Sequence, residues 1–308
     1  MELVISTCGK IAEMFILILL GVLSFKSKLI DESTSKKLSN FLLMLVSPCL
    51  ILNSYQIEYR PELIQRLFLC LVFSFLSFAL NILIVQMVIR PKSGPNIAID
   101  RMGIIYSNCA FIGIPLVEGV LGKEGVFYVS AYLTVLNILI WTHGVSLMVK
   151  GGSIKENLKN LNTPTIYAII IGLLLFFLQF KIPSILLNSI ASLGSMNTPL
   201  AMLIAGVNLA QSDLLRSFKS PRTYLISFIK LIVIPMATLL MLLIMGAERN
   251  IAFVVFICTA CPTGTITTML ALRYNKDARY ASEMFCTTTF FSMITIPVLT
   301  FLAGILLK

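Results

Sequence analysis

The chain has 308 residues, of which 57% are hydrophobic and only 12% are charged, and its formal net charge is +10. Soluble domains carry roughly 25% charged residues, so this composition excludes an ordinary soluble protein and is typical of a protein embedded in a membrane. The basic residues lie mostly between apolar segments, where they report membrane orientation, and we therefore expect no nucleic-acid partner.

Ten apolar segments of 17 to 27 residues can be drawn along the chain, and a helix that crosses a lipid bilayer needs roughly 20 apolar residues. The N-terminus has no basic n-region and no small-residue cleavage site, so we expect the first segment to be a retained helix. The predicted fold is an all-α polytopic membrane protein. Its segments 1 to 10 are Cys8–Phe25, Leu38–Ile57, Leu63–Ile89, Ala98–Leu121, Val126–Val149, Pro164–Phe180, Ile185–Leu209, Tyr224–Gly246, Ile251–Leu272 and Ala281–Leu307.

Basic residues between the segments predict the orientation of the chain. The side that holds the connections after segments 1, 3, 5, 7 and 9 has 16 of them, namely Lys26, Lys28, Lys36, Lys37, Arg90, Lys92, Arg101, Lys150, Lys155, Lys159, Arg216, Lys219, Arg222, Arg273, Lys276 and Arg279. The other side has seven, namely Lys10, Arg60, Arg66, Lys123, Lys181, Arg249 and Lys308. Cytoplasmic loops carry the excess of Lys and Arg. We therefore expect a multi-pass plasma-membrane protein with both termini outside.

The two halves of the chain resemble each other weakly. Ser47-Pro48-Cys49-Leu50 corresponds to Thr198-Pro199-Leu200-Ala201, 151 residues later, and Gly122-Lys123-Glu124 corresponds to Asn275-Lys276-Asp277, 153 residues later. Each half has five spans, so the second copy would enter the membrane from the opposite side, as in inverted-repeat transporters. We expect one repeat at residues 1–149, a cytoplasmic linker at Lys150–Thr163 and a second repeat at residues 164–308.

Segments 4 and 9 contain helix-breaking residues near their centres. Gly113 and Pro115 interrupt segment 4, and the stretch Pro262-Thr263-Gly264-Thr265 interrupts segment 9. Each could be a simple proline kink, but matched breaks in opposed repeats should cross at the bilayer midplane. The N-terminal ends of their second halves would then present N–H groups and partial positive charge. Transporters use such ends to bind anionic groups, so we expect a small organic anion, a carboxylate, as the ligand.

Polar side chains beside these breaks are the candidate ligand contacts. Asn108 precedes the break in segment 4, and its amide could donate to a carboxylate or cap an exposed backbone group. Thr263 and Thr265 could contribute hydroxyl groups, although threonine often bonds the backbone of its own helix.

Charged residues inside spans are functional candidates by default. Glu118 could bind a coupling proton, or it could extend to the membrane interface. Lys230 could attract an anion or pair with a carboxylate, and it too could extend to the interface. His143, the one histidine of the sequence, could change its protonation state during transport, or it could have a purely structural role. The cysteines fall mostly inside apolar segments, so we expect no disulfide, metal site or cofactor.

Two other classes of function compete with a carrier. A membrane-embedded enzyme would need clustered ligands or acids, whereas the chain has one histidine and singly scattered aspartates. We therefore expect no enzyme. A channel or sensor of organic anions is the alternative, but a channel favours a continuous polar stripe and the chain has two local breaks.

The motifs around these breaks resemble those of the auxin efflux carrier family of bacteria and plants, and the resemblance covers essentially the whole chain in segment order. The matching stretches are Asn108 to Leu116 (N-x4-G-x-P-L), Ile140-Trp141, Asn40-Phe41 with Val46-Ser47-Pro48, and Cys261-Pro262-Thr263-Gly264. The short connection between segments 5 and 6 is similar to that of the bacterial members.

The resemblance implies a fold shared with bile-acid symporters and sodium–proton antiporters. Segments 1, 2, 6 and 7 would form a scaffold that dimerises, and segments 3–5 and 8–10 a transport domain that moves like an elevator. It also implies that Asn108 contacts the substrate carboxylate at the crossover and that Val46, Ser47 and Pro48 line the same site. Ser47 stands where plant carriers are typically apolar, so the resemblance favours a dicarboxylate such as malonate or malate over auxin.

Overall fold

The computed structural model describes residues 2–90, 94–149, 163–211 and 220–307, with side chains from residue 9 onward except those of Lys10 and Ile11. Every named element within these ranges is a helix, and the one extended pairing there is an isolated bridge. The predicted all-α fold is therefore confirmed. Outside the described residues lie nearly all of the expected linker, at 150–162, and the basic residues Lys92, Lys150, Lys155, Lys159, Arg216, Lys219 and Lys308.

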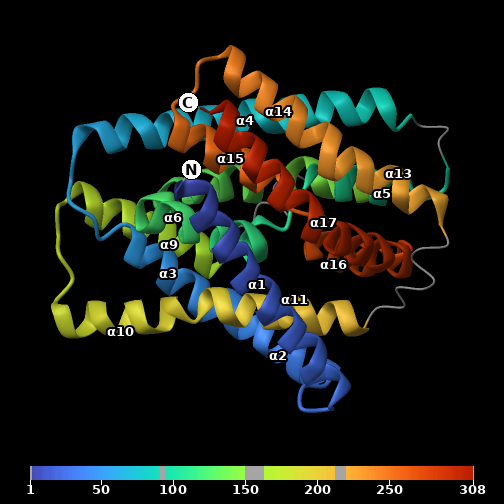
Figure 1. Ribbon diagram of the computed structural model, residues 1–308, viewed down its shortest axis with the longest axis horizontal. Coiled ribbons are helices and arrows are strands. Elements are labelled where there is room, and N and C mark those ends of the chain that lie inside the picture. Colours follow the sequence, from blue (N-terminus) through green and yellow to red (C-terminus); the bar gives the residue numbers. More distant parts are fainter. Residues whose placement is uncertain (1, 91–93, 150–162, 212–219, 308) are drawn as a thin grey trace. The chain divides into compact units, whose positions relative to one another are not determined.

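The helices of the chain are drawn in Figure 1. They divide into two compact units, each with segments from both sides of the expected linker. The first unit comprises Met1–Leu71, Ala110–Thr134 and Asn162–Gln211, and the second comprises Val72–Cys109, Val135–Leu161 and Ser212–Lys308. Helices α4 (Pro61–Val88) and α6 (Ile114–Leu139) and the π-helix η2 (Cys109–Gly113) have residues in both.

Two helices of the first unit, α1 and α11, pack along one another. Glycines allow this approach: a Cβ added at Gly206 would lie 2.0 Å from the carbonyl oxygen of Ile18, and one added at Gly21 would lie 2.2 Å from that of Leu203. Small residues of this kind let membrane helices approach closely. The described helices that lie wholly in the first unit are α1 (Glu2–Lys26), α2 (Glu32–Phe41), η1 (Leu42–Val46), α3 (Ser47–Ser54), α9 (Pro164–Phe177), α10 (Ser184–Ser195) and α11 (Asn197–Gln211).

The second unit is built around α17, which packs against α5, α13, α15 and α16. Segments 4 and 9 are each divided by a non-helical stretch, after α5 and after α15 respectively. The described helices that lie wholly in this unit are α5 (Ile97–Ile105), η3 (Ile140–Gly144), α7 (Val145–Met148), α13 (Pro221–Phe228), η5 (Ile229–Val233), α14 (Ile234–Ile244), α15 (Arg249–Ala260), α16 (Thr265–Arg273) and α17 (Ala278–Leu306).

Prolines follow three of the four π-helical stretches in the described residues. The π-helices η1, η2 and η5 each end two residues before a proline, which is Pro48, Pro115 or Pro235. A proline cannot donate to the carbonyl four residues back, and its ring clashes with that turn. The wider π-turn removes this clash and lets the helix continue. Proline in these spans therefore widens the helix without ending it.

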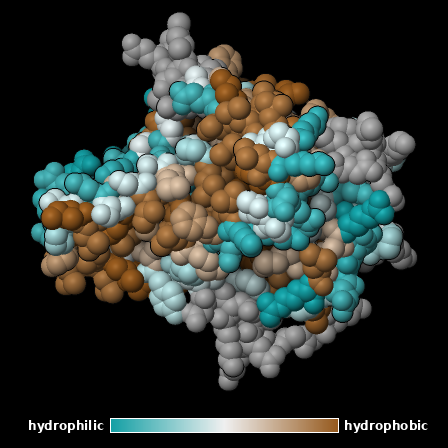
Figure 2. Space-filling view, turned by 90° about the horizontal axis from the view of Figure 1, so that it is seen from below, coloured by the Kyte–Doolittle hydropathy of each residue, from teal (hydrophilic) through white to brown (hydrophobic). Residues whose placement is uncertain are grey.

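Large apolar side chains remain exposed on the helices, such as Leu19 (61%), Phe68 (64%) and Ile244 (77%). Apolar residues cover much of the face seen in Figure 2, with polar ones gathered in patches. Exposed apolar surface on this scale is typical of helices that face lipid. Six helical stretches among the searched residues are long and apolar enough to span a membrane, namely Glu32–Ser54, Pro61–Val88, Cys109–Met148, Ser184–Gln211, Pro221–Ile244 and Ala278–Leu306.

Six cysteines have described side chains, and all six are free thiols: Cys49, Cys70, Cys109, Cys258, Cys261 and Cys286. Cys258 and Cys261 have C-x-x-C spacing, yet both are fully buried and neither forms a disulfide. No group of three or more potential metal ligands occurs within the residues searched. Buried thiols of this kind act as small apolar side chains in the core.

Candidate functional site

The interruptions of segments 4 and 9 meet each other within the second unit. Ser107 and Thr263 form an antiparallel bridge. The backbone N–H of Asn108 donates to the carbonyl oxygen of Pro262 at 2.8 Å. Backbone groups released by a helix break inside a membrane protein need partners. The two breaks therefore provide hydrogen-bond partners for each other, and we refer to this contact as the crossing.

A second backbone hydrogen bond joins the two breaks. It runs from the N–H of Gly264 to the carbonyl oxygen of Tyr106, at 3.0 Å. The α-carbon of Gly264 lies so close to the other break that an added Cβ would be 3.3 Å from the carbonyl oxygens of both Tyr106 and Ser107. A side chain here would need these neighbours to shift by a few tenths of an ångström. Gly264 therefore contributes to the site by allowing the two backbones to approach.

The position of the break in segment 4 differs from the prediction. Helix α5 ends at Ile105, and the non-helical residues are Tyr106, Ser107 and Asn108, several positions before Gly113 and Pro115. Gly113 ends the π-helix η2 and Pro115 lies in the first turn of α6. The expectation that these two residues break the helix is wrong, because the π-turn accommodates the proline. In segment 9 the break is at 261–264, as predicted.

Three polar groups at the crossing are available to a ligand. The carboxamide of Asn108 makes no hydrogen bond within the described residues, and 6% of the Asn108 surface is exposed. The N–H groups of Thr265 and Ile266 open helix α16, and neither has an acceptor among the described residues. Both residues are partly exposed. Free N–H groups and the helix dipole make such an end favourable for an anion.

The hydroxyl of Thr263, by contrast, serves the protein itself. It is fully buried and donates to the carbonyl oxygen of Gly103 at 3.0 Å. The N–H of Thr263 donates to the hydroxyl of Thr288 on α17 at 3.2 Å. These bonds fix the break of segment 9 to α5 and α17, which gives Thr263 a structural role beside the candidate site.

Lys230 lies next to the crossing, in the π-helix η5. Its side chain is fully buried, so the alternative that it extends to the membrane interface is wrong. Its Nζ donates to Ser107 Oγ at 2.6 Å and to the carbonyl oxygen of Thr259 at 3.4 Å. Ser107 Oγ in turn lies 3.2 Å from that same carbonyl oxygen and donates to it. The buried amino group of Lys230 therefore contacts the crossing through neutral oxygen atoms.

His143 also contacts a residue of the crossing, Tyr106. Its Nδ1 is 2.8 Å from the hydroxyl of Tyr106, which also donates to the carbonyl oxygen of Leu139 at 2.9 Å. A phenol has one hydroxyl proton, and Tyr106 donates it to the carbonyl oxygen of Leu139. The contact with His143 is then a hydrogen bond only if Nδ1 of His143 carries a hydrogen and donates it to the Tyr106 oxygen. His143 is half-buried and orients Tyr106, which favours the structural reading of this residue.

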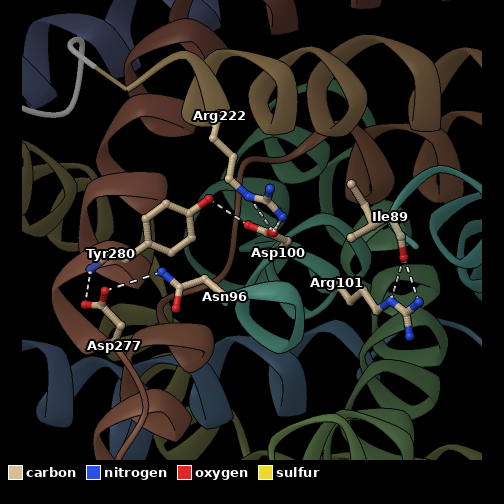
Figure 3. Close-up of polar contacts among 7 residues, drawn as sticks. All are labelled: Ile89, Asn96, Asp100, Arg101, Arg222, Asp277 and Tyr280. Atoms are coloured by element: carbon tan, nitrogen blue, oxygen red, sulfur yellow. Dashed lines mark hydrogen bonds and ion pairs between the residues drawn. The ribbon is translucent and has the colours of Figure 1, made fainter. Parts of the chain in front are cut away.

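A second polar cluster of this unit joins the starts of three helices (Figure 3). Asp100 on α5 is fully buried; its Oδ2 accepts from Arg222 Nε at 2.9 Å and its Oδ1 accepts from the hydroxyl of Tyr280 at 2.6 Å. Asp277 accepts from the N–H of Tyr280 and so caps α17. The sequence reading treated Asp100 as an isolated acid and Arg222 as a loop charge, since no local spacing relates them.

The first unit holds a polar cluster around two of the predicted repeat positions. The hydroxyl of Ser47 donates to Asn197 Oδ1 at 2.8 Å, and the hydroxyl of Thr198 donates to Glu118 Oε2 at 3.2 Å. Asn197 is fully buried, and its Nδ2 has no partner among the described residues. Val46 is buried and Pro48 is half-buried. Sequence reasoning missed Asn197, although it directly precedes the Thr198-Pro199 pair that the repeat had singled out.

Comparison with known proteins places the chain in a family. Residues 6–157 and 152–300 match the family described as membrane transport protein. The chain belongs to this family. An uncharacterised transporter of Methanocaldococcus jannaschii is 29% identical to it, over 89% of this chain and 92% of that protein. The predicted relation to the auxin efflux carriers is confirmed by these matches.

Membership of the membrane transport protein family agrees with the apolar helices of the structure. A family match across most of the chain and several helices of membrane-spanning length indicate a multi-pass membrane protein that transports. Such a protein moves its ligand without changing it, which is consistent with the expectation that the chain is not an enzyme.

Proposed function

We propose that the protein is a secondary transporter of a small organic anion, a mono- or dicarboxylate of the malonate or malate kind, which binds where the two helix breaks cross. One observation carries this proposal. The carboxamide of Asn108 and the N–H groups that open α16 belong to one unit, at one crossing, and lack protein partners among the described residues. A carboxylate has two oxygens and accepts from several donors at once.

The proposed contacts in the second unit are Asn108, Pro262, Gly264 and Thr265. Asn108 and the start of α16 would donate hydrogen bonds, while Pro262 and Gly264 shape the break that exposes these donors. Val46, Ser47 and Pro48 remain predicted contacts from the resemblance alone. Gly113 and Pro115 were predicted as contacts from the expected break of segment 4, and they remain predictions. Glu118 and Lys230 remain candidates for coupling.

We further propose ten membrane spans in two inverted five-helix repeats, residues 1–149 and 164–308, with both termini outside the plasma membrane. Segments 1, 2, 6 and 7 would form the scaffold of a homodimer, and segments 3–5 and 8–10 would move as an elevator. The presence of segments 1, 2, 6 and 7 in the first unit supports the scaffold, although that unit also contains Ala110–Thr134 of segments 4 and 5. The partners are then the organic anion, the lipid bilayer and a second copy of the chain.

Counterflow in proteoliposomes tests the proposal. Vesicles loaded with unlabelled malonate or malate should accumulate the labelled anion transiently, and the rate should saturate with external concentration. A channel would give flux that does not saturate and no transient accumulation. Either of these results, or the absence of flux for every carboxylate in a panel, contradicts the proposed transport.

A further inference from the structure

The last carbonyl groups of α15 form, at the crossing, an environment suited to a cation. Helix α15 ends at Ala260, so the carbonyl oxygen of Thr259 belongs to the last turn of this helix. This end of a helix carries partial negative charge. In secondary transporters, unwound carbonyls and the C-terminal ends of half-helices coordinate the coupling Na⁺. The hydroxyl of Ser107, 3.2 Å from that carbonyl oxygen, adds a second neutral oxygen.

In this protein the amino group of Lys230 already lies among those oxygens. Lys230 Nζ is 2.6 Å from Ser107 Oγ and 3.4 Å from the carbonyl oxygen of Thr259, and the side chain is fully buried. Ser107 donates onward to the same carbonyl oxygen, so both groups orient lone pairs toward positive charge. The geometry is that of a cation at a helix C-terminus, with the cation attached covalently to the chain.

No acid of the described residues competes for this ammonium. The ion pairs found there involve other residues, and none includes Lys230. Its titratable neighbours are the thiols of Cys109 and Cys261. A buried charge is costly unless it is compensated. Here the compensation comes from the end of α15 and, in the loaded protein, would come from an anion at the start of α16.

We propose that the Lys230 ammonium takes the place of a soluble coupling cation at the crossing, so that the protein binds its organic anion without Na⁺ or K⁺. The claim that an organic anion binds at the crossing rests on the proposed function. The claim that Lys230 takes the place of a cation does not rest on it, because that claim concerns only Lys230 and the oxygens of Ser107 and Thr259. A neutral, shorter side chain at position 230 should open these oxygens to a free cation.

The first measurement needs no anionic ligand. The full chain in detergent is melted in Na⁺, K⁺ or choline at equal ionic strength, as wild type, as Lys230→Ser and as Lys181→Ser, a control at an exposed lysine. We expect Na⁺ to raise the melting temperature of Lys230→Ser only. A Na⁺-specific shift in the wild type, or none in a folded Lys230→Ser, would overturn the proposal.

The second measurement titrates malonate onto the wild type and onto Lys230→Met, which fills the same space without charge. We expect wild-type affinity to agree within about twofold among the three cations, and Lys230→Met to bind at least about tenfold more weakly. Na⁺ stimulation of the wild type, or unchanged affinity in Lys230→Met, would overturn the proposal even if Lys230→Ser does not fold. If the melting shifts appear but no carboxylate binds any variant, the transport proposal fails and the cation site stands.

Discussion

The backbone N–H of Asn108 donates to the carbonyl oxygen of Pro262 at 2.8 Å, and this bond ties the break of segment 4 to the break of segment 9. The two residues come from opposite halves of the chain. Because their backbones satisfy one another, the Asn108 side chain has no structural hydrogen bond within the described residues and remains available to a ligand.

Removing that carboxamide should therefore affect binding more than folding. We expect Asn108→Ala to weaken carboxylate binding by about 10- to 100-fold, since a hydrogen bond to a charged group contributes about 1.5–3 kcal/mol. Its melting temperature should stay near that of the wild type. Calorimetric titration with malonate measures the first and thermal unfolding the second. Asn188→Ala, at an exposed residue of α10, is the control, and wild-type binding by Asn108→Ala would remove this residue from the site.

Sequence alone predicted the helices well because apolar length and helix breakers are local signals. All ten segments are helical over most of their length, and the breaks of segments 4 and 9 meet. It failed on where segment 4 breaks, because a proline such as Pro115 can be absorbed by a π-turn, and no sequence rule distinguishes that outcome from a true break.

The close approach of α1 and α11 makes a second prediction. Gly206→Ala should lower stability by about 1–3 kcal/mol, the usual cost of overpacking, because the added methyl would meet the carbonyl oxygen of Ile18. Gly9→Ala, in the same helix as Ile18, is a matched control with no atom within 4 Å of the added Cβ. Thermal unfolding in detergent compares them, and equal melting temperatures would contradict the packing described for this pair.

The ion pair of Asp100 and Arg222 makes a third prediction. Asp100→Asn keeps the shape of the buried side chain but removes the carboxylate that pairs with Arg222. Breaking a fully buried pair costs about 3–5 kcal/mol, and since the Arg222 side chain is 29% exposed we expect a smaller loss of about 2 kcal/mol. Arg279→Gln removes an exposed ion pair to Glu283 and should change the melting temperature little. If both variants melt at similar temperatures, the pair of Asp100 and Arg222 does not stabilise the fold as described.

Glu118 gives a prediction about pH. It accepts a hydrogen bond from Thr198 at 3.2 Å, and Glu118→Gln preserves that acceptor while removing the ionisable group. If Glu118 carries the coupling proton, the variant should transport with a rate that no longer depends on pH between about 5 and 8. The test is the rate of uptake across that pH range, with Glu32→Gln, at an exposed residue, as the control. An unchanged pH profile would assign Glu118 to the structure.

The polar contacts at the sites were less predictable than the helices. Ser107, Asp100 and Asn197 were not singled out, because each acquires its role from a partner far away in the chain, such as Lys230, Arg222 or Ser47. Hydrophobic periodicity contains no information on such partners. Only the charge inside a span indicated that Lys230 mattered, and the structure then showed that it is buried and contacts the crossing.

The most direct test of the central claim is an experimental structure of the protein in a lipid nanodisc with bound malonate. The account predicts that α15 and α16 remain separate helices, with one carboxylate of the ligand within hydrogen-bonding distance of the Asn108 carboxamide and of the N–H groups of Thr265 and Ile266. A continuous helix through Pro262, or malonate bound away from the crossing, would contradict it.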